Sequence, residues 1–275
     1  MNPGDVMTES QPETRPETRP ETSPETSPET RPQTSPETRH EDREDRRLEL
    51  RTNLQEISRR VAVACTRADR DPAGIVVIVI TKTYPASDVR LLHGLGVRDV
   101  GENRDQEAAA KAADCADLDL TWHFVGQLQR NKAASVARYC DVVHSVDRGR
   151  LVTALDAGAA RAGRRLDALV QVDLTDPPAP GRGGAAPANV LELCAQVSAA
   201  DHLELRGLMA VAPLGEDPTA AFARLAGVRA QVLDRFPEAD WLSAGMSGDL
   251  EAAVMAGATH LRVGSAVLGE RAHVG

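Results

Sequence analysis

The feature that most constrains the fold is a regular alternation of short apolar segments with longer segments that favour helix. The apolar segments predict eight strands, at residues 75–82, 99–101, 122–126, 142–145, 168–174, 204–211, 241–244 and 260–263. A helical segment separates each strand from the next, which favours parallel pairing. Eight such units predict an α/β fold of the TIM-barrel class, a closed (β/α)8 barrel. An open, doubly wound sheet is the alternative architecture.

The first 46 residues have a different composition from the rest of the chain. From Pro12 the sequence repeats Pro-Glu-Thr-Arg or Pro-Glu-Thr-Ser through Arg39. Proline at every fourth position removes backbone donors, and the repeat has no apolar side chains to bury. We therefore expect residues 1–46 to be a disordered tail and residues 47–275 to form the barrel domain. Within that domain, residues 48–66 should add an extra N-terminal helix.

Composition excludes several classes of protein. The net charge of −9 argues against a nucleic-acid partner or an anionic membrane surface. No apolar run has the length of a membrane span, and the first residues do not resemble a secretory signal. The cysteines are far apart and form no metal-type cluster: Cys65, Cys115, Cys140 and Cys194. Such isolated cysteines are typical of a reducing compartment, so we expect a cytoplasmic protein without a bound metal.

Lysine is scarce in this chain, which draws attention to Lys82. Of the 32 lysines and arginines, only Lys82, Lys111 and Lys132 are lysines. Lys82 ends the predicted strand 75–82, so its amine should lie at the mouth of the barrel, where ligands bind. Desolvation there would lower the pKa of the amine toward the reactive neutral form. A side chain that simply reaches solvent is the alternative interpretation.

The loops after the last two predicted strands are rich in glycine and serine. They comprise residues 243–249 and 262–265, and we expect Ser247 and Asp249 to stand at a helix start. Free backbone amides and the helix dipole at such a start favour an anion. A phosphate site after strands seven and eight is also a recurrent feature of barrels. Simple helix caps would produce a similar pattern.

Six segments, in this order, span about residues 48–271: Thr81–Thr83, Val100–Asn103, Trp122–Lys132, Arg206–Met209, Leu242–Ala253 and Arg262–Gly269. Together they resemble the pyridoxal phosphate homeostasis protein family, whose fold is similar to the barrel domain of alanine racemase. Thr81 stands where that family usually has serine, and Ser265 where it often has threonine. Both exchanges keep a hydroxyl group.

The resemblance implies that the barrel binds pyridoxal 5'-phosphate (PLP) and that Lys82 holds it as a Schiff base. It also implies cofactor contacts from residues that follow other strands or lie near their ends: Asn103, Met246, Ser247, Arg262, Gly264 and Ser265. Ser247, Gly264 and Ser265 would bind the phosphate. Asn103 and Met246 would lie beside the ring.

The resemblance also implies that Arg262 faces the pyridine nitrogen. A cation there disfavours protonation of the ring and weakens the cofactor as an electron sink. His123 is open to two interpretations, either a hydrogen-bonded wall residue or a catalytic group.

Two functions follow from this site. The first is PLP homeostasis, in which the protein stores, buffers or delivers the cofactor to apo PLP-dependent enzymes, with no turnover of its own. The second is an amino-acid racemase, which needs a base on each face of the α-carbon. In alanine racemase the opposing tyrosine comes from a second domain, and we expect none after Gly275. Tyr84 is a possible second base, although a loop role is the simpler interpretation.

We therefore favour a carrier, and we expect it to be a monomer. A phosphate-binding barrel for another ligand, with Lys82 acting only through its charge, is a third possibility.

Overall fold

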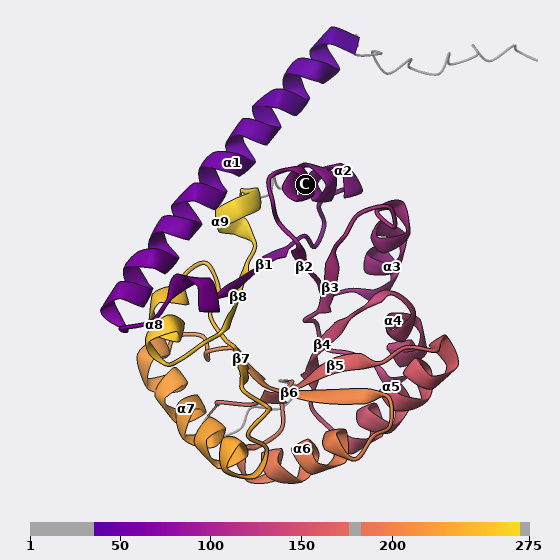
Figure 1. Ribbon diagram of the computed structural model, residues 1–275, viewed down its shortest axis with the longest axis vertical. Coiled ribbons are helices and arrows are strands. Elements are labelled where there is room, and N and C mark those ends of the chain that lie inside the picture. Colours follow the sequence, from indigo (N-terminus) through magenta and orange to yellow (C-terminus); the bar gives the residue numbers. More distant parts are fainter. Residues whose placement is uncertain (1–35, 176–182, 270–275) are drawn as a thin grey trace, which may run out of the picture. The chain divides into compact units, whose positions relative to one another are not determined.

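The computed structural model describes residues 36–175 and 183–269. Glu41–Gly275 form one compact unit, which contains a closed barrel with strand order β1-β2-β3-β4-β5-β6-β7-β8 (Figure 1). The strands are β1 (Val76–Ile80), β2 (Asp99–Glu102), β3 (Thr121–Phe124), β4 (Val142–Val146), β5 (Leu166–Val172), β6 (Leu203–Ala210), β7 (Trp241–Ser243) and β8 (His260–Val263). Every neighbouring pair is parallel, and β8 pairs with β1. The prediction of a closed barrel is confirmed, and the open sheet is excluded.

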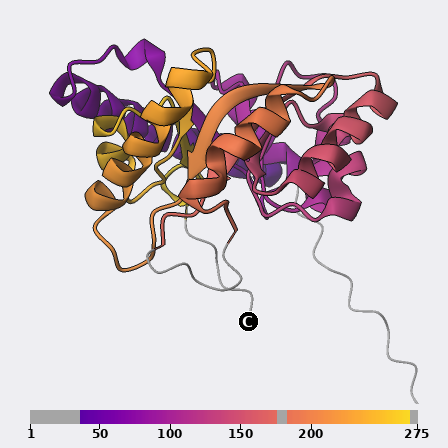
Figure 2. The same ribbon diagram turned by 90° about the horizontal axis from the view of Figure 1, so that it is seen from below.

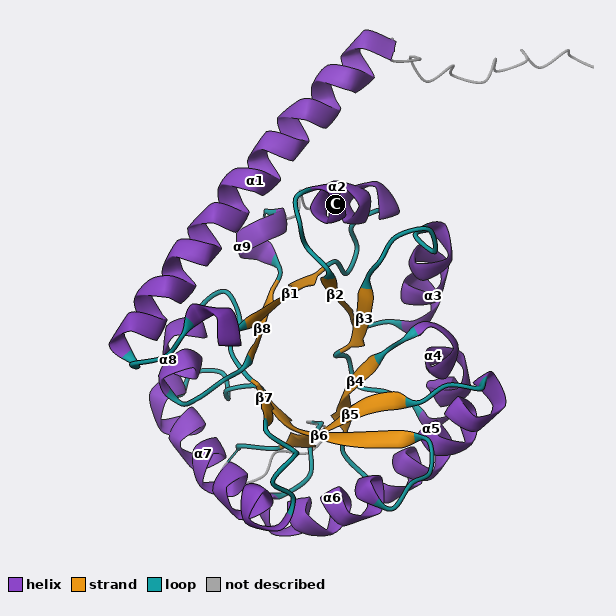
Figure 3. Ribbon diagram, viewed as in Figure 1, coloured by secondary structure: helices purple, strands orange, loops and turns teal. Residues whose placement is uncertain are grey.

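Helices surround the ring of strands (Figure 3), and a view turned by 90° shows the same ring from its edge (Figure 2). The helices are α1 (Pro36–Arg67), α2 (Ala86–Gly94), α3 (Asp105–Asp114), α4 (Ala133–Tyr139), α5 (Gly149–Ala162), α6 (Val190–Ser198), α7 (Pro218–Arg235), α8 (Leu250–Met255) and α9 (Ser265–Leu268). Within the described residues, no helix combines the length and the apolar composition needed to span a bilayer.

Helix α1 packs through a narrow apolar stripe. Leu50, Ile57 and Val61 are buried, and their spacing of seven and four residues places them on one helical face. Leu48 and Val63 share the apolar pattern but are exposed. The predicted extra helix is therefore present and joins the main hydrophobic core.

The start of α1 differs from the prediction. The helix begins at Pro36, inside the segment expected to be a tail, and not near Arg47. Proline is compatible with a first helical turn, because its missing N–H has no intrahelical partner there. The expected disorder of residues 1–35 lies outside the described residues and stays a prediction.

Candidate functional site

A cavity of about 710 Å³ opens where the strands end. Its lining includes all seven residues predicted to contact a cofactor: Lys82, Asn103, Met246, Ser247, Arg262, Gly264 and Ser265. They come from the ends of β1, β2, β7 and β8, which a parallel barrel brings to one face. The structure thus brings the predicted residues together in one cavity.

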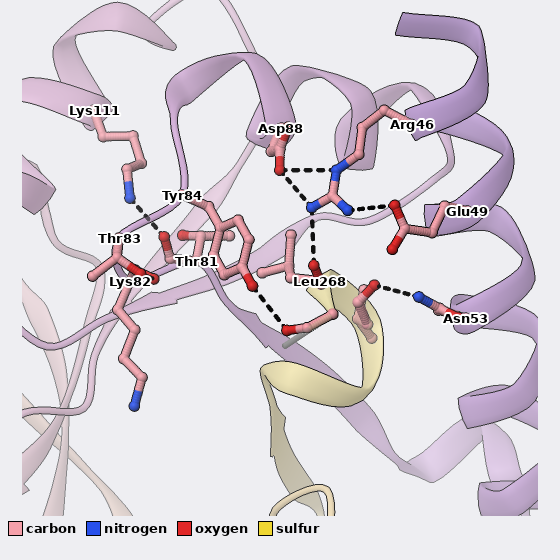
Figure 4. Close-up of polar contacts among 12 residues, drawn as sticks. Arg46, Glu49, Asn53, Thr81, Lys82, Thr83, Tyr84, Asp88, Lys111 and Leu268 are labelled. Carbon is pink, nitrogen blue, oxygen red and sulfur yellow. Dashed lines mark hydrogen bonds and ion pairs between the residues drawn. The ribbon is translucent and has the colours of Figure 1, made fainter. Parts of the chain in front are cut away.

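Lys82 follows β1 and extends away from the neighbouring Lys111 (Figure 4). Its side chain is exposed, so the expectation of a desolvated amine is wrong. Among the described residues, no hydrogen bond or ion pair holds its amino group. Lys82 therefore presents a free amine to the cavity.

The backbone immediately before Lys82 is held by a buried ion pair. Lys111 of α3 contacts the carboxylate of Glu102 and donates to the carbonyl oxygen of Thr81 at 2.8 Å. The Thr81 hydroxyl donates to the same carboxylate at 2.6 Å. Lys111 and Glu102 are 5 % and 1 % exposed, and burial raises the pKa of Glu102. Sequence reasoning assigned no role to Lys111, because its partner is set by the packing of α3 on the barrel.

The residue after Lys82 is also constrained. Thr83 has φ of 68°, which is unusual for a β-branched residue, and its N–H donates to the carboxylate of Glu107. Such strain persists only where the surroundings fix the backbone. Both neighbours of Lys82 are therefore anchored. Thr81 is held by Lys111 of α3 and by Glu102 at the end of β2, and Thr83 is held by Glu107 of α3.

Asn103 lies where two loops touch. A Cβ atom at Gly126 would be 2.2 Å from the carbonyl oxygen of Asn103, so only glycine permits this approach. The close contact joins the loops after β2 and β3 beside the cavity.

The turn after β7 also depends on glycine. Gly245 has φ of 90°, and a Cβ atom there would be 2.6 Å from that of Ala253. The N–H of Met246 donates to the carboxylate of Asp249 at 2.5 Å. Helix α8 begins at Leu250 with Asp249 as its N-cap residue, so Asp249 stands at the helix start as predicted, whereas Ser247 lies in the preceding turn.

Two loops meet at the predicted phosphate site. The Ser247 hydroxyl oxygen accepts a hydrogen bond from the N–H of Ala266 at 3.4 Å. Ala266 belongs to α9, a short helix that begins at Ser265 and was not predicted. This contact places the loop after β7 against the first turn of α9.

The carbonyl end of α9 is clamped by three side chains (Figure 4). Arg46 donates to Leu268 O at 3.0 Å, Asn53 to Val267 O at 2.9 Å and Tyr84 to Gly269 O at 2.8 Å. Satisfying these carbonyl groups fixes the end of the helix. We call Arg46, Asn53 and Tyr84 the α9 clamp.

Arg46 also joins α1 to α2. Its guanidinium group donates to one carboxylate oxygen of Asp88 from Nε at 3.2 Å and from Nη2 at 2.7 Å. Arg46 also lies 5.7 Å from the centre of the Tyr84 ring. Arg46 thus belongs to the folded unit, although it falls within the segment expected to be a tail.

We expect two truncations to differ sharply. Removal of residues 1–40 should change the free energy of unfolding by less than about 0.5 kcal/mol, the range of typical surface changes, because the proline repeat has no apolar side chains to bury. Removal of residues 1–46 also deletes Arg46 and should cost about 1–3 kcal/mol, the range for hydrogen bonds to charged groups. Urea unfolding of the two truncated proteins and the full chain measures this difference. Equal stability of both truncations would contradict the importance of Arg46.

A second polar feature crosses the interior of the barrel, and we call it the interior network. It consists of Asp99, His123, His144, Ser243 and Arg262. Successive side chains are joined by contacts of 3.0 Å from Asp99 to His123, 2.9 Å from His123 to His144, 2.9 Å from His144 to Ser243 and 2.6 Å from Ser243 to Arg262. Strands β4 and β7 are not neighbours, so the bond between His144 and Ser243 spans the barrel.

Arg262 is the member of this network that reaches the cavity. Besides its bond to Ser243, it donates from Nη2 to the carbonyl oxygen of Ala210 at 2.8 Å. Burial lowers the pKa of Arg262 to about 10, which still leaves it a cation at neutral pH. The cavity therefore contains a firmly held positive charge in addition to a free amine.

These groups suit a phosphorylated aldehyde. The free amine of Lys82 can bond to a carbonyl carbon, and the anchored cation of Arg262 can face a ring nitrogen. The hydroxyls of Ser247 and Ser265 lie in the same cavity and can donate to phosphate oxygens. The set of donors present fits PLP.

Comparison with known proteins places the chain in a family. The alanine racemase N-terminal domain model matches residues 52–272. A pyridoxal phosphate homeostasis protein of Mycobacterium tuberculosis is 46% identical over 235 residues, which cover 79% of this chain and 91% of the relative. The chain belongs to the pyridoxal phosphate homeostasis protein family. The Escherichia coli member of this family is 36% identical over 225 residues, or 80% of this chain and 95% of that protein.

A solved structure also supports the fold. PipY of Synechococcus elongatus, determined with PLP bound, superposes with a TM-score of 0.68 at 37% identity. The match covers 78% of this chain and all of PipY (100%). The predicted resemblance to the pyridoxal phosphate homeostasis protein family is thereby confirmed.

Proposed function

We propose that this protein binds PLP and takes part in intracellular PLP homeostasis by storing, buffering or delivering the cofactor. One observation carries the proposal: a single cavity joins the free amine of Lys82, the buried cation of Arg262 and the serine-rich turn at Ser247 and Ser265. The names of the relatives and the PLP-bound PipY structure support it.

Each lining residue has a role in this proposal. PLP supplies an aldehyde, to which Lys82 would be joined as a Schiff base. Gly264, Ser247 and Ser265 would hold the phosphate, and Arg262 would donate to the pyridine nitrogen. Asn103 and Met246 would lie beside the ring.

The position of Tyr84 favours a carrier over the alternative, an amino-acid racemase. Racemisation needs a second base opposite the lysine. The Tyr84 hydroxyl instead donates its proton to the carbonyl oxygen of Gly269 within the α9 clamp. Arg262, a cation at the ring nitrogen, also disfavours the ring protonation that stabilises a carbanion.

An isotope exchange experiment separates the two functions. The PLP-loaded protein is incubated with L-alanine in deuterated water, and deuterium at the α-carbon and chirality are followed. A carrier should show slow or absent exchange. Turnover of about 1 s⁻¹ or faster, the lower end of ordinary enzymes, would exclude the carrier. Loss of that turnover in Tyr84→Phe would identify Tyr84 as the second base.

Delivery and assembly are further parts of the proposal. The free amine of Lys82 lies at an exposed position, so PLP held there is accessible to water and to amines of an apo PLP-dependent enzyme. We propose that the protein acts as a monomer in the cytoplasm, where its buried thiols stay reduced. Transfer of PLP to a purified apo-enzyme, monitored by the activity regained, tests delivery directly.

A further inference from the structure

With neutral histidines, the interior network has one possible direction of hydrogen bonding, because its two ends are chemically different. Arg262 has only donors, whereas the ionised carboxylate of Asp99 has only acceptors. The Ser243 hydroxyl oxygen accepts from Arg262, so its own proton is available to Nδ1 of His144.

The same reasoning fixes both imidazole tautomers. Nδ1 of His144 accepts from Ser243, so the proton of His144 lies on Nε2 and is donated to Nδ1 of His123. His123 then carries its proton on Nε2 and donates it to Asp99. With both rings neutral, all bonds between Arg262 and Asp99 therefore run in one direction.

Burial supports this arrangement. His123, His144, Ser243 and Arg262 are at most 4 % exposed, and among the described residues Arg262 forms no ion pair with a carboxylate. Burial and the nearby His123, Arg262 and His260 hold the pKa of His144 well below its usual range, which keeps it neutral. The hydrogen bonds of the network thus connect the partly exposed Asp99 to the buried cation of Arg262.

We propose that Asp99, His123, His144 and Ser243 are positioning residues that hold Arg262 in one orientation at the cavity through a one-way chain of hydrogen bonds. This role toward the cofactor rests on the proposed function. With two of its N–H groups committed to Ser243 and Ala210, Arg262 keeps its other N–H groups for the ring nitrogen. The chain thereby determines where the cation stands before the cofactor arrives.

The tautomers can be measured without the cofactor. In the full-length protein free of PLP, with ¹⁵N-labelled histidine, the ring nitrogen resonances report which nitrogen carries the proton. His144→Gln and His123→Gln assign the two signals among the seven histidines of the chain. We expect the proton on Nε2 in both neutral rings. A proton on Nδ1 of either residue, or a doubly protonated ring, would overturn the proposal.

A pair of substitutions tests the effect on PLP. His144→Leu has a similar size but no polar atoms, whereas His144→Gln keeps one acceptor and one donor. We expect PLP to dissociate about tenfold or more faster from His144→Leu, a change of about 1.4 kcal/mol, and His144→Gln to regain most of that loss. Equal dissociation from wild type and His144→Leu would show that the network does not position Arg262.

These experiments distinguish a failure of the interior network to position Arg262 from a failure of the proposed function. If wild-type protein fails to bind PLP, the proposed function is wrong, and the tautomers of the cofactor-free protein still decide the direction of the network. If His144→Leu does not fold, a dissociation rate for folded His144→Gln that is close to wild type supports the proposal. A rate for His144→Gln that is tenfold faster contradicts it.

Discussion

Lys82→Ala is expected to abolish covalent attachment of PLP to lysine side chains. Lys82 supplies the free amine of the cavity, whereas Lys111 is buried in an ion pair and Lys132 lies 3.7 Å from Asp105. Borohydride reduction of the PLP-loaded wild type, followed by peptide mapping, should place the label on Lys82. The Lys82→Ala protein should carry no labelled lysine.

Lys132→Ala is the matched control for this experiment. It removes another lysine, from the loop after β3 at the same face of the barrel, and should leave the labelling of Lys82 intact. A label on Lys111 or Lys132 in the wild type, with Lys82 unmodified, would refute the assignment of Lys82.

Lys111→Met is expected to lower the free energy of unfolding by about 3–5 kcal/mol. The substitution leaves the Glu102 carboxylate buried without its cation, and that penalty is typical of a broken buried pair. It also removes the donor to the carbonyl oxygen of Thr81, next to Lys82. Urea unfolding monitored by circular dichroism gives the value.

Two further variants test whether the loss of stability in Lys111→Met comes from the broken ion pair. Lys132→Met removes a lysine whose side chain is 36 % exposed, and should cost no more than about 1 kcal/mol. The double variant Glu102→Gln with Lys111→Met should be more stable than Lys111→Met alone, because no charge stays buried. If Lys111→Met and Lys132→Met were equally stable, the ion pair would contribute little.

Most of the strands could be predicted because they are short runs rich in apolar residues and bounded by polar turns. In a closed barrel of eight parallel strands, all carboxyl ends lie at one face. Lys82 and Arg262 therefore line one cavity, although they are far apart in the sequence. The start of α1 could not be predicted in this way. Pro36 follows a proline repeat, and the residues up to Leu48 are polar, so no apolar periodicity marks them as helical.

The interior network also escaped prediction, for a different reason. His144 and Ser243 are 99 residues apart. Their contact depends on which side chains of β4 and β7 point into the barrel at the same level along its axis. His123 was correctly considered as a hydrogen-bonded wall residue, but its partners Asp99 and His144 follow from strand register. Arg262 was singled out only through the resemblance to a known family.

The scarcity of lysine has a consequence for stoichiometry. Free PLP reacts with any accessible amine, so a lysine-rich surface would collect it at many places. Here Lys111 is buried in an ion pair with Glu102, and the amino group of Lys132 lies beside the carboxylate of Asp105. Among the described residues, Lys82 is therefore the lysine with a free amino group. Apart from the α-amino group, the protein should therefore take up one equivalent of PLP even when the cofactor is in excess, as a buffer of defined capacity requires.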